Sequence, residues 1–347
     1  MTTYITNGQP WDQQYDFNTS QVTNITGWAG DTNLPVGISQ ASAIVTRNRV
    51  YIFTGVSSYT AAISGSGVIG AWAASDALPY NMANDACAWI TKNRVYLAGG
   101  TNAGSEYINK VYSAPIDDAG MIGTWSESAS LIDGRYAAKS IITKDRVYLI
   151  GGIGGGGVGY RNTTLTAPID DDGIVGAWEY GPSLPITLAW TSLADVNGRI
   201  YVLGGVSAGV KVSNTYSATY GETGVLSAWS AGSSLSVIIS KSSPVVTRSR
   251  IYLLGGDVSG GTVLTAPINS DGTIGTWAFG TTLYRAAMRS MAAVTTNSRV
   301  YLLGGGNPST TAYVQYAPFS GGYNDYSEIG YVSIFWTNFS GQTEILT

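Results

Sequence analysis

The sequence predicts an all-β protein, a β-propeller assembled from repeated four-stranded antiparallel sheets. A short apolar segment that follows an arginine and ends in glycine occurs six times, beginning at Arg49, Arg94, Arg146, Arg199, Arg250 and Arg299. Successive copies lie 45 to 53 residues apart, a period that is typical of repeat architectures. Each copy is rich in β-branched and aromatic residues, so each is expected to form a strand that stops at a turn.

Four strands are expected in every repeat. The first, such as residues 140–143, is apolar, ends in threonine and is joined to the arginine strand by a turn of hairpin length. The third, such as residues 165–169, contains Ala-Pro, and the missing proline amide places this strand near the edge of the sheet. After an acidic, glycine-containing turn, the fourth run ends in tryptophan, at Trp72, Trp125, Trp178, Trp229 and Trp277.

A sheet of this kind cannot bury both of its faces alone, and radial packing of four-stranded sheets gives a β-propeller. The Gly-Gly doublet, followed by a tyrosine and then a tryptophan, resembles the repeat of Kelch-type β-propellers over nearly the whole chain. This resemblance implies the fold and leaves the activity open, because propellers of this type serve many functions. We expect the repeated tryptophans to be buried between blades.

The ends of the chain favour seven blades. Tyr15 precedes Trp28 by the 13 residues that also separate Tyr112 from Trp125, which indicates a third and a fourth strand near the N-terminus. Residues 343–347 resemble a first strand and are expected to pair with residues 3–6. A single domain of residues 1–347 would then close with a blade built from residues 1–28 and 334–347, which leaves no open sheet edge. The alternative is six blades, with residues 320–347 as an extension.

The composition indicates a protein of a virion or of the extracellular surface. Charged residues make up only 12% of the chain and the net charge is −4, which argues against nucleic acid and anionic membranes as partners. No apolar run is long enough to insert into a membrane as a helix. The first residues do not have the pattern of a signal peptide, which a virion protein does not need. A cytoplasmic location is the alternative.

Several kinds of catalytic and cofactor site are excluded by residue type. The chain has no histidine, so histidine-based triads and the usual zinc and copper sites cannot form. Three consecutive aspartates, at 170–172, suit charge pairing between turns better than calcium, whose loops space their ligands alternately. We therefore assign no catalytic residue, metal or cofactor. A glycosidase that works with two carboxylates is the minority alternative.

One face of the propeller is expected to bind a ligand. Positions nine or ten residues before each repeated arginine mark the mouth of the central channel, and their side chains differ between blades. These positions and the adjacent connections supply the predicted binding residues Gln40, Tyr80, Asp85, Arg135, Tyr136, Trp190, Lys241, Arg285 and Arg289. Aromatic rings together with amides and charges suit the recognition of a sugar or a protein.

We therefore expect a non-catalytic binding or structural protein, most simply a bacteriophage virion component on a tail or capsid surface. Its expected partner is a glycan or protein on a host surface, with other virion proteins as further partners. The alternative is a scaffold propeller that docks a protein partner and binds no small ligand.

Overall fold

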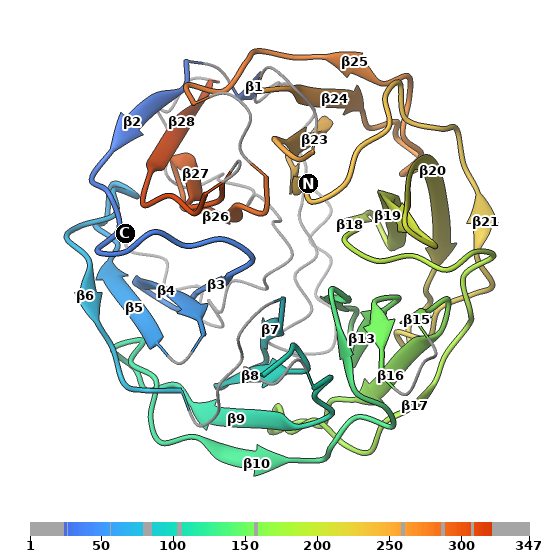
Figure 1. Ribbon diagram of the computed structural model, residues 1–347, viewed down its shortest axis with the longest axis horizontal. Coiled ribbons are helices and arrows are strands. Elements are labelled where there is room, and N and C mark those ends of the chain that lie inside the picture. The colour runs from blue at the N-terminus through green and yellow to red at the C-terminus, as the bar shows by residue number, and fades with distance from the viewer. Residues whose placement is uncertain are drawn as a thin grey trace, which may run out of the picture.

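Every regular element of the described chain is a β-strand. The computed structural model describes residues 24–25, 27–55, 57–78, 85–102, 106–155, 159–257, 261–285, 289–306 and 309–320. Figure 1 shows their strands standing radially around a central axis. Six sheets form the blades of this propeller, and a seventh, much smaller sheet lies in the loops of blade 3.

Five blades follow one another along the chain, each with its strands in sequence order from the axis outward. Blade 1 contains β3 (Ser42–Val45), β4 (Arg49–Thr54), β5 (Ser57–Ala62) and β6 (Ala73–Ala74). Blade 2 contains β7 (Cys87–Ile90), β8 (Arg94–Ala98), β9 (Val111–Pro115) and β10 (Ser126–Ser128). Blade 3 contains β12 (Lys139–Ile142), β13 (Arg146–Ile150), β16 (Thr164–Pro168) and β17 (Glu179–Tyr180).

Blade 4 contains β18 (Ser192–Val196), β19 (Arg199–Ser207), β20 (Val210–Thr219) and β21 (Ser230–Ala231). Blade 5 contains β22 (Ser243–Val246), β23 (Arg250–Leu254), β24 (Val263–Pro267) and β25 (Ala278–Phe279). The small seventh sheet is formed by β11 (Arg135–Tyr136), β14 (Ile153–Gly154) and β15 (Gly159–Tyr160).

Blade 6 joins the two ends of the described chain. Its inner strands are β26 (Ala292–Thr295), β27 (Arg299–Leu303) and β28 (Val314–Ser320), and its outer edge is formed by β1 (Asn24–Ile25) and β2 (Ala29–Asp31). Both N-terminal strands pair antiparallel with β28, so they act as one interrupted fourth strand. Trp28 lies between them, as each other repeated tryptophan lies just before the fourth strand of its own blade.

Hydrogen bonds from the repeated tyrosines show that the six blades form a closed cycle. Tyrosine hydroxyls donate to a glycine carbonyl of the next blade over 2.9 to 3.2 Å, in the pairs Tyr51–Gly120, Tyr96–Gly173, Tyr148–Gly224 and Tyr201–Gly272. Tyr252 of blade 5 accepts the amide of Ile25 in blade 6, and Tyr301 of blade 6 donates to Gly67 of blade 1. The last blade is thus bonded to the first.

The all-β propeller fold predicted from the sequence is confirmed, and the described residues close it with six blades, the count that was the alternative. The physical reason is that Trp28 and its flanking strands complete blade 6, so the described residues hold no further four-stranded blade. The two ends of the described chain do share a sheet. The N-terminal segment supplies only the fourth strand of that sheet, and β26, β27 and β28 supply the other three. The expected pairing of residues 343–347 with residues 3–6 lies outside the described residues.

The core lies between blades, in one apolar cluster at each of the six blade interfaces. Trp178, Trp229 and Trp277 are buried there as predicted, and Trp125 is half-buried. The indole ring of Trp178 meets that of Trp89 edge to face, with centroids 6.0 Å apart. The fourth strands begin after the tryptophans rather than ending in them, because the indole rings turn inward to the interface.

Candidate functional site

A belt of left-handed backbone surrounds the axis at the start of each inner strand. It consists of one residue from each blade, with φ between 48° and 59°, namely Gln40, Asp85, Ala137, Trp190, Lys241 and Ser290. The amide of a belt residue donates to the carbonyl of the belt residue in the preceding blade, as in Trp190–Ala137, Lys241–Trp190 and Ser290–Lys241, each over 3.0 Å. Gln40 bonds to Ser290 in the same way and closes the belt.

The six belt residues share one backbone conformation and position, but their side chains differ from blade to blade. Non-glycine residues in this conformation cost on the order of 1 kcal/mol each and persist where the surroundings hold them. Here the inter-blade hydrogen bonds hold them, in residues as different as alanine, aspartate and tryptophan. The repeat therefore places variable side chains at the channel mouth, at the positions that the sequence marked.

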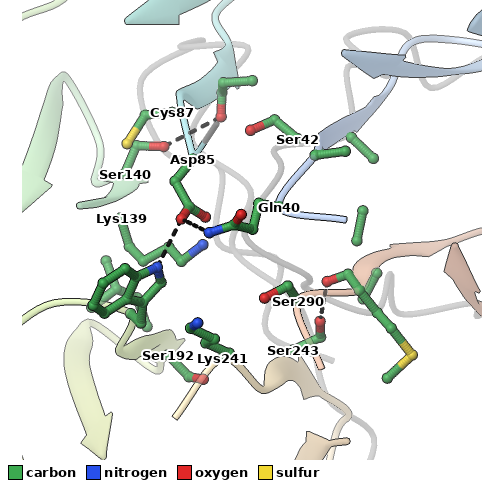
Figure 2. A pocket seen from close by; sticks show the side chains of 18 of the residues that line it. Gln40, Ser42, Asp85, Cys87, Lys139, Ser140, Ser192, Lys241, Ser243 and Ser290 are labelled. Carbon is green, nitrogen blue, oxygen red and sulfur yellow. Dashed lines mark hydrogen bonds between the residues drawn. The ribbon is translucent and has the colours of Figure 1, made fainter. Parts of the chain in front are cut away.

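A cavity of about 110 Å³ lies at the belt and is lined by the first strands of all six blades. Figure 2 shows the polar side chains that point into it, among them Asp85, Lys139 and Lys241. These three are the charged residues among its described lining, and the remaining lining is serine, threonine, glutamine, alanine and a few larger apolar residues. Five of the six belt residues, Gln40, Asp85, Trp190, Lys241 and Ser290, are part of its lining.

Asp85 connects two other predicted binding residues, Gln40 and Trp190. Its side chain is buried, and its Oδ2 accepts a hydrogen bond from Gln40 Nε2 at 2.6 Å and one from Trp190 Nε1 at 2.7 Å. Lys241 Nζ lies 4.7 Å from the centroid of the Trp190 ring, within the range of a cation–π interaction. Side chains from blades 1, 2, 4 and 5 thus meet at one place.

An aromatic cluster extends from the belt onto the loops of blade 3. The Tyr136 ring lies 5.4 Å from that of Tyr107 and 5.7 Å from that of Trp190, and Tyr160 lies 6.4 Å from Trp190. The small sheet of β11, β14 and β15 holds Tyr136 and Tyr160. Burial raises the pKa of Tyr136, with Tyr107 and Asp85 adding to the effect, so its hydroxyl stays protonated and can donate.

Arg289 and Arg285 lie outside the cavity. Arg289 Nη1 pairs with Asp257 Oδ1 at 2.8 Å, and Lys211 Nζ lies 3.8 Å from Oδ2 of the same carboxylate. Burial acts to raise the pKa of Asp257, but the Arg289 hydrogen bond and the nearby lysines outweigh it and lower that pKa. Arg285 is exposed, and its guanidinium stacks on Tyr313 at 4.4 Å.

Arg135 was predicted to bind ligand, and the structure corrects this. Its side chain is 1% exposed and its guanidinium is saturated by Asp133, at 2.6 Å, and by the carbonyl oxygens of Gly151 and Thr163. Burial lowers its pKa against the opposing effect of Asp133. This arginine ties blade 3 to the connection that precedes it and has no donor to offer a ligand. Tyr80, another predicted residue, lies outside the described residues.

Lys139 is a lining residue that the sequence prediction missed. It stands two positions after the belt, where other blades place Ser42, Cys87, Ser192 and Ser243. Those residues donate to a backbone carbonyl of the next blade, for instance Ser192 to Ser242 at 2.8 Å and Ser243 to Met291 at 2.7 Å. The strand alternation that puts the serines in the channel would have placed Lys139 there too.

The opposite face carries charged turns that connect neighbouring blades. Arg47 of blade 1 pairs with Asp118 of blade 2 at 3.0 Å, and Lys144 of blade 3 pairs with Glu222 of blade 4. The pairing of turns expected from the sequence is therefore present, and it runs between blades. Exposed pairs of this kind contribute below about 1 kcal/mol each. Within the described chain no group of three or more potential metal ligands occurs.

Known proteins resemble this chain in fold and in part of its sequence. No family model matches it. Kelch repeat and BTB domain-containing protein 2 of cowpox virus, in strains GRI-90 and Brighton Red, is 29% identical over 128 residues, which is 37% of this chain and 21% of each relative. The solved structure of YjhT matches with a TM-score of 0.65 and 13% identity, over 83% of this chain and 95% of that one. The protein has the fold of a β-propeller, and its repeats resemble those of Kelch-type propellers.

The chain spans about a fifth of the length of these cowpox virus relatives, so those proteins contain much that it does not match. The likeness to YjhT shows the fold alone. Among the described residues no helix could cross a membrane.

Proposed function

We propose that this protein is a non-catalytic binding propeller whose ligand sits on the belt-side face, at the mouth of the channel. The observation that carries the proposal is the convergence of Asp85, Trp190, Lys241 and Tyr136 from four different blades. None of these side chains is required by the repeat, since Ala137 and Ser290 occupy the same belt. A tryptophan held at φ 50° is an unusual conformation for so bulky a residue, and such outliers cluster at functional sites.

The lining favours binding over glycoside hydrolysis. Glycosidases of the usual kind place two carboxylates about 5 to 10 Å apart across the bond that they cleave. Among the described residues Asp85 is the one carboxylate that lines the cavity, and one of its oxygens already accepts two hydrogen bonds. Rigid aromatic rings beside orienting polar groups are typical of recognition sites for sugars and proteins.

The proposed partner is a glycan or protein on a host surface, and the proposed setting is a bacteriophage virion. Support comes from the low content of charged residues, 12%, and from a sequence rich in tyrosine, serine and threonine. A scaffold that docks another protein is the rival proposal, and the same face would serve it. Binding to purified glycans distinguishes the two.

The test is the double variant Trp190→Ala, Tyr136→Ala, measured for binding to host cells and to a glycan array. Alanine is already tolerated at the belt position of blade 3, so the variant should fold and keep its melting temperature within a few degrees. The matched control is Tyr180→Ala, Phe279→Ala, which removes two exposed aromatic rings from the outer strands β17 and β25. We expect binding to be lost in the first variant and kept in the control. Full binding by the Trp190, Tyr136 variant would refute the proposed face.

A further inference from the structure

We propose that the ligand carries a carboxylate on a hydroxylated framework, as in a uronic acid residue, and that Lys139 and Lys241 bind this carboxylate inside the cavity. This inference rests on the proposed function and adds to it the chemical class of the ligand. It is carried by the charges of the lining, by the direction of its hydrogen bonds and by its size.

The cavity has an excess of positive charge in a protein that is acidic as a whole. Two lysines and one aspartate line it, whereas the full chain has a net charge of −4. Within the described structure no carboxylate lies within ion-pairing distance of Lys139 or Lys241. Figure 2 shows both lysine side chains directed into the cavity. Charges in a partly enclosed site interact more strongly than on open surface, so an anion is favoured there.

Three serines of the lining offer acceptors rather than donors. Ser42, Ser192 and Ser243 use their hydroxyl hydrogens on backbone carbonyls of the next blade. Gln40 likewise donates through its Nε2 to Asp85, which leaves its carbonyl oxygen as an acceptor. Lone pairs on these oxygens suit the hydroxyl hydrogens of a ligand. A ligand that matches the whole lining therefore combines one anionic group with several hydroxyl groups.

The size of the cavity fits the acidic end of one sugar residue. Its volume is about 110 Å³, somewhat less than a cavity of roughly 150 Å³ that holds benzene. A carboxylate and the ring atoms next to it would fill this space, and the rest of the ligand would emerge beside Trp190 and Tyr136. A folded protein segment is too large to enter.

Lys139 gives the inference its clearest test, because its replacement by serine restores the residue of the other blades. In blades 1, 4 and 5 a serine at this place bonds to the next blade, so Lys139→Ser should keep or raise stability. Binding is measured by titration calorimetry at constant ionic strength, with sodium D-galacturonate and with D-galactose, which lacks the carboxylate. Sodium acetate tests the carboxylate without hydroxyl groups. Lys92→Ser, on the opposite face, is the control for loss of one positive charge.

We expect galacturonate to bind about tenfold or more tightly than galactose and acetate, and Lys139→Ser to weaken galacturonate by a similar factor. Lys92→Ser should bind as the unchanged protein does. Equal binding of galactose and galacturonate, no binding of either, or galacturonate binding that ignores Lys139→Ser would each overturn the inference. A poly-glutamate peptide that binds more tightly than galacturonate would overturn the sugar assignment. The proposed function is tested separately. If these outcomes overturned the uronic acid assignment, host-surface binding that is lost in the Trp190→Ala, Tyr136→Ala variant would still support the proposed binding face.

Discussion

Asp195 is a carboxyl group whose surroundings favour its protonated form. It lies in β18, accepts a hydrogen bond from the hydroxyl of Tyr220, and is packed so closely that burial raises its pKa to about 6, against the lowering effect of Tyr220 and Gly198. Since the pKa is higher in the folded than in the unfolded chain, the folded state binds this proton more tightly. Its contribution to stability is complete below about pH 4 and is lost as the pH rises through 6.

The variant Asp195→Asn should therefore be stabilised relative to the unchanged protein as the pH rises. We expect the difference between the two free energies of unfolding to change by on the order of 2 kcal/mol between pH 4 and pH 8. Denaturant unfolding at both pH values measures it. The control is Asp172→Asn in an exposed turn, which should leave the pH dependence as it is. Parallel pH profiles for Asp195→Asn and the unchanged protein would contradict the argument.

Single residues also show what the sequence could and could not predict about the site. The belt positions followed from the repeat, because each lies nine residues before the repeated arginine of its blade. Arg135 was misjudged because its partners, Asp133 and two backbone carbonyls, become visible only when blade 3 and its connection are assembled. Lys139 could have been predicted, because it lies two residues after the belt position and strand alternation directs it into the channel.

At the scale of elements, the repeated tryptophans stabilise the packing of neighbouring blades against one another. Trp178 is 8% exposed, lies edge to face against Trp89, and donates its indole hydrogen to the carbonyl of Ala129 in blade 2. Trp125 occupies the same place in the repeat but is only half-buried. The same sequence signal therefore corresponds to two different amounts of burial.

Replacing Trp178 by alanine should lower the free energy of unfolding by about 3–5 kcal/mol, the usual cost of removing a large buried ring. Trp125→Ala should cost clearly less, because part of its ring already faces solvent. Chemical denaturation of both variants gives the comparison. Equal losses at the two positions would mean that burial at the blade interface is not what these tryptophans contribute.

The strands themselves were largely predictable, because three apolar runs in each repeat have strong β propensity and clear turns between them. The fourth strand was not, since it is only two or three residues long in the five consecutive blades and follows the tryptophan. The blade count depended on this strand. Ile25 and Trp28 have the spacing of Ile69 and Trp72, and they belong to the edge of blade 6.

At the scale of the whole molecule, closure of the cycle is what protects the sheet edges. Each blade is bonded to the next by its tyrosine, and blade 6 reaches blade 1 through Tyr301, which donates to Gly67 and accepts the amide of Ile69 at 3.2 Å. The outer edge of β28 is covered by β1 and β2, from the other end of the described chain. Without them β28 would present unpaired backbone groups to solvent.

Removing residues 1–31 should therefore open the propeller. The truncated chain loses β1, β2 and Trp28, so we expect a melting temperature lower by many degrees and association through the exposed edge of β28. Differential scanning calorimetry and light scattering measure the two effects. The matched control removes residues 1–23 alone, which keeps both strands and the tryptophan. Its loss of stability should be the smaller of the two, because the edge of blade 6 stays covered; equal losses would place closure in residues 1–23 instead.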